Sequence, residues 1–71
     1  MNTDHLIKMV NEIAAFFDGE SGAEQAPKEV AAHLRKFWEK RMRHEIISHL
    51  RKGGTGLSET ARGAVGILAN G

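Results

Sequence analysis

The side chains best suited to acid–base or metal chemistry are the four histidines, His5, His33, His44 and His49. Two of them follow a glutamate by four residues, in the pairs Glu29–His33 and Glu45–His49, a spacing that places both side chains on one helix face. Metal-binding helices use this spacing, but such sites need further ligands from elsewhere, and the sequence has no cysteine. We interpret both pairs as surface contacts and predict no catalytic, cofactor or metal site in this chain.

The length of the chain argues against catalysis by the chain alone. With 71 residues it forms at most one domain, and a domain of this size has little room for a pocket of about 300 Å³ or more. A nucleophile elbow, a P-loop and a dinucleotide fingerprint are all missing from the sequence. We see no signal peptide and no apolar run of about 20 residues. We therefore expect a cytoplasmic protein without a membrane partner, and a partner subunit is a real possibility for so small a domain.

A basic stretch with aromatic residues, AHLRKFWEKRMR over residues 32–43, holds the only tryptophan and five of the ten lysines and arginines. Small helical nucleic-acid-binding proteins use such stretches, so a nucleic-acid-binding or regulatory protein that uses the basic region 35–52 is the alternative function. However, Glu39 and Glu45 interrupt the region and the net charge is only +1. We therefore expect no nucleic-acid partner. Tryptophan and arginine also anchor protein interfaces, which favours a non-catalytic interaction subunit, although Trp38 can equally belong to the core.

These residues are expected to lie on helices, because apolar side chains repeat at intervals of three and four residues and the sequence has no strand pattern. The prediction is an all-α domain: a small bundle of three helices, at about 3–18, 27–39 and 41–52, plus a weak C-terminal fourth at about 58–69. The intervening stretches 18–26 and 53–58 are expected to be loops. Gly63 and Gly66 weaken the last helix, each by up to about 1 kcal/mol relative to alanine.

A change of phase predicts a corner within the basic stretch. One helical face carries Val30, Leu34, Phe37 and Trp38, whereas the next apolar set, Met42, Ile46, Ile47 and Leu50, would point to roughly the opposite side of the same helix. Two helices that meet at residues 39–41 remove this conflict. Phe37 and Trp38 are then expected on the inside of the corner.

The residues also resemble a known family, the delta subunit of the NAD-dependent, molybdenum-containing formate dehydrogenases. The likeness lies in LIKMVNEIAAFF (6–17), is strongest in VAAHLRKFWEKRMRHEIISHL (30–50), and resumes in GGTGLS (53–58). The family usually has proline where this chain has Lys40, and a proline there would end the preceding helix. The family pattern thus supports the corner.

The resemblance implies an accessory role in assembly or stability of the enzyme complex. It implies that this chain holds no cofactor, and that molybdopterin, iron–sulfur clusters and FMN belong to partner subunits. The expected partner is the large catalytic subunit. The residues predicted to bind it are Trp38, Arg41, Met42, Arg43, Gly56 and Leu57.

Overall fold

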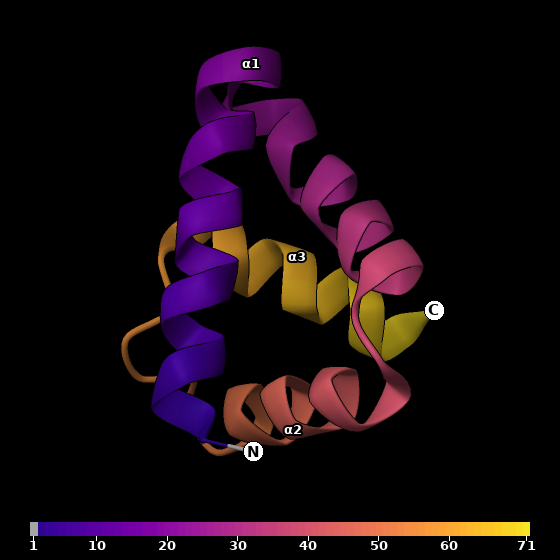
Figure 1. Ribbon diagram of the computed structural model, residues 1–71. Helices are drawn as coiled ribbons and strands as arrows, with labels where there is room; N and C mark the ends of the chain where they lie inside the picture. Colours follow the sequence, from indigo (N-terminus) through magenta and orange to yellow (C-terminus); the bar gives the residue numbers. More distant parts are fainter. Residues whose placement is uncertain (1) are drawn as a thin grey trace.

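The described part of the chain folds into three α-helices. The computed structural model describes residues 2–71, and its helices are α1 (Thr3–Phe37), α2 (Lys40–Arg51) and α3 (Glu59–Asn70), as shown in Figure 1. The described residues include no β-strand, so the predicted all-α class is confirmed. Among these helices, none is both long and apolar enough to cross a membrane.

Helix α1 is a hairpin of two limbs, residues 3–21 and 23–37, which turn back on each other at Gly22 (Figure 1). Gly22 has φ 81° and ψ 160°, a conformation open essentially to glycine alone. The predicted loop over 18–26 is therefore wrong. Alanine, glutamate and glutamine, which fill most of positions 20–26, are good helix formers, so a single residue makes the turn and Pro27 lies inside α1.

The predicted break between the second and third helical segments is confirmed, but it lies at Trp38 and Glu39 rather than at residues 39–41, because Lys40 and Arg41 already belong to α2. Both residues are extended, with ψ values of 140° and 155°. Arg43 stabilises the corner because its guanidinium Nη1 donates hydrogen bonds to the carbonyl oxygens of Arg35, at 2.9 Å, and Trp38, at 3.1 Å. Carbonyl groups at a helix end otherwise lack partners within the helix.

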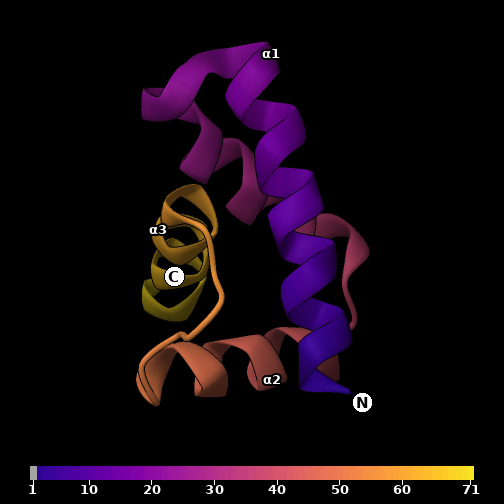
Figure 2. The same ribbon diagram turned by 90° about the vertical axis from the view of Figure 1, so that its left-hand side faces the viewer.

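Helix α3 packs across one face of the α1 hairpin, while α2 lies across the open end of the hairpin (Figures 1 and 2). Ser58 caps α3 by accepting a hydrogen bond from the Ala61 amide at 3.2 Å. The helix approaches the second limb closely at Gly63, where a Cβ atom would lie 3.2 Å from Cβ of Pro27. The weak fourth helix expected from the sequence is thus a regular helix with a long buried face.

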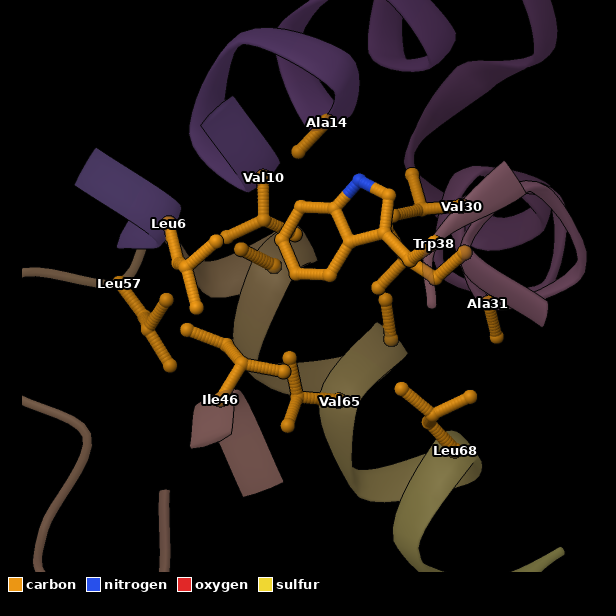
Figure 3. Close-up of a cluster of buried hydrophobic side chains, with 13 residues drawn as sticks. Leu6, Val10, Ala14, Val30, Ala31, Trp38, Ile46, Leu57, Val65 and Leu68 are labelled. Carbon is orange, nitrogen blue, oxygen red and sulfur yellow. The ribbon is translucent and has the colours of Figure 1, made fainter. Parts of the chain in front are cut away.

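The hydrophobic core is formed by all three helices and the loop before α3. Trp38, which is 5% exposed, lies in the middle of the cluster between α1 and α3 (Figure 3). The side chains around it come from every element: Leu6, Val10, Ala14, Val30, Ala31, Leu34, Ile46, Leu57, Ala61, Ala64, Val65 and Leu68. The corner at residues 38–39 therefore serves to turn the indole ring into the core.

Candidate protein-docking surfaces

Three of the six residues predicted to bind a partner belong to the core or pack against it. Trp38 and Leu57 are buried, and Met42 is half-buried against the same cluster. For Trp38, the sequence left core and interface as alternatives, and the structure gives it a core position. Its burial means that a partner reaches the indole only if the domain opens.

The other three predicted residues have different surroundings. Arg43 holds the corner through its two carbonyl contacts, whereas Arg41 is exposed on α2. Gly56 is exposed in the loop before α3, and its carbonyl oxygen accepts a hydrogen bond from Nδ2 of Asn11 at 2.9 Å. The structure therefore does not bring the six residues together on one surface, and their role in partner binding stays a prediction.

Among residues 2–71, the large apolar side chains that are exposed are Phe16 and Phe37, at 60% and 64%. They are the two ends of a row of rings that crosses from one limb of α1 to the other. The ring centroids are 5.2 Å apart for Phe16 and Phe17, 6.1 Å for Phe17 and His33, and 4.7 Å for His33 and Phe37. We call Phe16, Phe17, His33 and Phe37 the aromatic cluster. Phe16 and Phe37 at its ends are exposed, whereas Phe17 is half-buried and packs against the core.

The prediction that Phe37 lies inside the corner is wrong. Phe37 is the last residue of α1, and its ring packs on His33 instead of entering the core. The Nζ atom of Lys36 lies 5.6 Å from the Phe37 ring centroid, so a cation accompanies the exposed ring. A signal for this surface existed in the sequence, because the apolar arc of residues 3–18 is wider than one neighbouring helix needs.

A second surface feature is a groove between α2 and the C-terminal end of α3. Two adjoining hollows, of about 400 and 480 Å³, share His44, Ile47 and Leu68 as lining residues. The other lining residues are three arginines, Ala69 and Gly71. We give the name basic groove to the basic and large apolar residues of this lining: Arg35, Arg43, His44, Ile47, Arg51 and Leu68.

The Glu–His pairs have separate surroundings in the structure. His33 belongs to the aromatic cluster, whereas His49 Nε2 lies 2.7 Å from the Thr55 carbonyl oxygen and donates to it as an N–H group. Glu45 accepts a hydrogen bond from the hydroxyl group of Thr3. Within residues 2–71 no group of three or more histidine, cysteine, aspartate or glutamate side chains is placed to hold a metal ion.

Comparison with known protein families places this fold and these surfaces in context. Residues 5–65 of the 71-residue chain match the family described as NADH-dependent formate dehydrogenase delta subunit FdsD. The curated proteins and the solved structures contain no match to the chain. The match includes the aromatic cluster, the corner at Trp38 and the loop before α3, and it agrees with the resemblance seen in the residues. The chain therefore belongs to the family of NADH-dependent formate dehydrogenase delta subunits.

Proposed function

We propose that this chain is a non-catalytic accessory subunit that binds the large catalytic subunit of a cytoplasmic formate dehydrogenase and stabilises or helps to assemble the complex. The observation that carries the proposal, beyond family membership, is the aromatic cluster. Two phenylalanine rings more than half exposed are unusual on so small a surface. Aromatic side chains are enriched where protein interfaces are buried.

Burial of this surface would contribute a measurable part of the free energy of a specific contact. Full burial of a phenylalanine side chain contributes about 1.5–3 kcal/mol. Since Phe16 and Phe37 still expose 60% and 64% of their surface, docking would recover about 1–2 kcal/mol from each ring. The two rings together correspond to about a 30- to 1,000-fold change in dissociation constant.

The residues of the chain support the assignment of the cofactors to partner subunits. Iron–sulfur clusters are held by cysteine thiolates, and this chain has no cysteine. The aromatic cluster is an exposed row of rings, which suits contact with another protein better than enclosure of a cofactor. We place molybdopterin, iron–sulfur clusters and FMN in the partner subunits, and formate oxidation with them.

The experiment is to produce the catalytic subunits with and without this chain. We expect the chain to co-purify with them and to raise at least one of three quantities: formate-dependent NAD reduction, molybdenum content, or lifetime on heating. The isolated chain should oxidise no formate. If it never co-purifies and all three quantities are identical with and without it, the proposed function is wrong.

A further inference from the structure

We propose that the basic groove binds an acidic segment of a partner subunit, in which carboxylates flank an apolar side chain. The proposal rests on the accessory function proposed above and adds a second contact surface with a partner of defined chemistry. The first observation is the charge of the groove. Three arginines, Arg35, Arg43 and Arg51, line it together with His44.

The positive charge of the groove is not neutralised by the hydrogen bonds that orient it. Arg35 donates to the carbonyl oxygen of Ile67 at 3.2 Å, and Arg43 donates to two carbonyl oxygens of α1 and the corner. All of these acceptors are uncharged backbone groups. A guanidinium group has five N–H donors, so each of these two side chains keeps donors beyond these bonds, and Gly71 lies close to Nη2 of Arg35 in the same hollow. Because both arginines are already held in place, binding costs less side-chain entropy than it would for free arginines.

The apolar residues at the bottom of the groove favour a peptide over a nucleic acid as its ligand. Ile47 is half-buried and Leu68 is 8% exposed, and both line each of the two hollows. A nucleic-acid backbone would satisfy the arginines but leave this apolar floor uncovered. A peptide with an apolar side chain between carboxylates matches both the floor and the walls.

The size of the aromatic cluster makes a second contact necessary. A specific interface buries about 800 Å² on each partner, whereas two largely exposed phenylalanine rings supply about 250 Å². Arg35 of the groove and Phe37 of the cluster lie two residues apart at the end of α1. Because residues two apart on a helix point to different sides, a partner that occupies both surfaces must wrap around this end of α1.

The test reverses a charge of the groove in the full chain, co-expressed with the catalytic subunits. Arg51→Glu is made alone and with His44→Glu, since both residues are exposed and neither holds the fold together. Lys28→Glu, an exposed site outside the groove, changes the charge of the chain by the same amount as Arg51→Glu and is the matched control. We expect about tenfold or more weaker association for the groove variants, with unchanged association for Lys28→Glu and unchanged helical circular dichroism for all.

A second arm identifies the occupant. In the complex, Arg51→Lys combined with Lys52→Arg is treated with a carbodiimide, which joins an amine directly to a neighbouring carboxylate. We expect the lysine at position 51 to be linked to an aspartate or glutamate of a partner subunit, beside an apolar residue. Links to a second copy of this chain instead, or duplex DNA binding that Arg51→Glu removes, would overturn the assignment.

The outcomes separate this proposal from the proposed function. If the unaltered chain binds the catalytic subunits and the groove variants bind equally well, the groove assignment is wrong and the accessory function stands. Equal weakening by Lys28→Glu would indicate general attraction between charges and would also overturn the groove. If the unaltered chain does not associate at all, both proposals fail.

Discussion

Two substitutions of the same kind in α3, Gly66→Ala and Gly63→Ala, should change stability differently. Alanine is more favourable than glycine in a helix interior by about 1 kcal/mol. At Gly66 an added Cβ atom meets nothing within 4 Å, so the full gain is expected. For a domain of 60–100 residues, about 1 kcal/mol raises the Tm by about 4–8 °C.

At Gly63 the same Cβ atom would lie 3.2 Å from Cβ and 3.4 Å from Cγ of Pro27. The proline ring is closed onto the backbone and cannot rotate away, so α3 must move from α1. Overpacking of this kind costs about 1–3 kcal/mol, which cancels or exceeds the helix gain. We expect the Tm of Gly63→Ala to be equal to or below that of the unaltered chain, measured by far-UV circular dichroism. An equal rise in Tm for both variants would refute the close approach of α3 to Pro27.

Three further predictions concern the turn, the corner and the core. Gly22→Ala should destabilise the chain by about 1–3 kcal/mol, because alanine is strained at φ 81° and ψ 160°; an unchanged Tm would show that the turn lies elsewhere. Lys40→Pro should be tolerated or stabilise by about 0.4–1 kcal/mol, because Lys40 is the first residue of α2 and Glu39 already has the extended conformation that precedes proline. A large drop in Tm would contradict the corner. Trp38→Ala should lower stability by about 3–5 kcal/mol, most of the stability of so small a domain, and urea unfolding that matches the unaltered chain would remove Trp38 from the core.

The all-α class and the corner could be predicted from the sequence because both depend on local periodicity. A phase change between two apolar stripes requires a break, whatever the rest of the chain does. The cap at Ser58 is likewise a local signal, and it lies where the structure begins α3. These features follow from spacing within one or two helical turns.

The features that residue spacing could not predict depend on contacts between distant parts of the chain. Thr60 donates a hydrogen bond to Asp18 at 2.6 Å, and Asn11 both donates to Gly56 and accepts from the Ser58 amide. The Asn11 bonds hold the loop before α3 in place, and the Thr60 bond joins α3 to α1. They also explain why a helix weakened by two glycines is regular, since packing against α1 outweighs its low intrinsic propensity.

The aromatic cluster is a second feature that the spacing of residues along the chain could not predict. Phe37 lies on the apolar stripe by periodicity, yet it shares a helix face with the half-buried His33, at the edge of the buried face that carries Val30 and Leu34. Periodicity indicates which face of a helix is apolar but not how wide a strip of that face the neighbouring elements bury. For the same reason, the sequence placed Trp38 and Phe37 together, whereas the structure buries one and exposes the other.

The central claim, that this delta subunit docks through the aromatic cluster, is tested most directly by the affinity of the Phe16→Ala/Phe37→Ala variant for the purified catalytic subunits. Both rings are mostly exposed, so the isolated variant should keep the Tm of the unaltered chain, as surface substitutions usually do. Lys28→Ala, at an exposed site outside the cluster, is the control. We predict a dissociation constant about 30- to 1,000-fold higher for the double variant and an unchanged one for the control. An unchanged dissociation constant for the double variant would contradict docking through this surface.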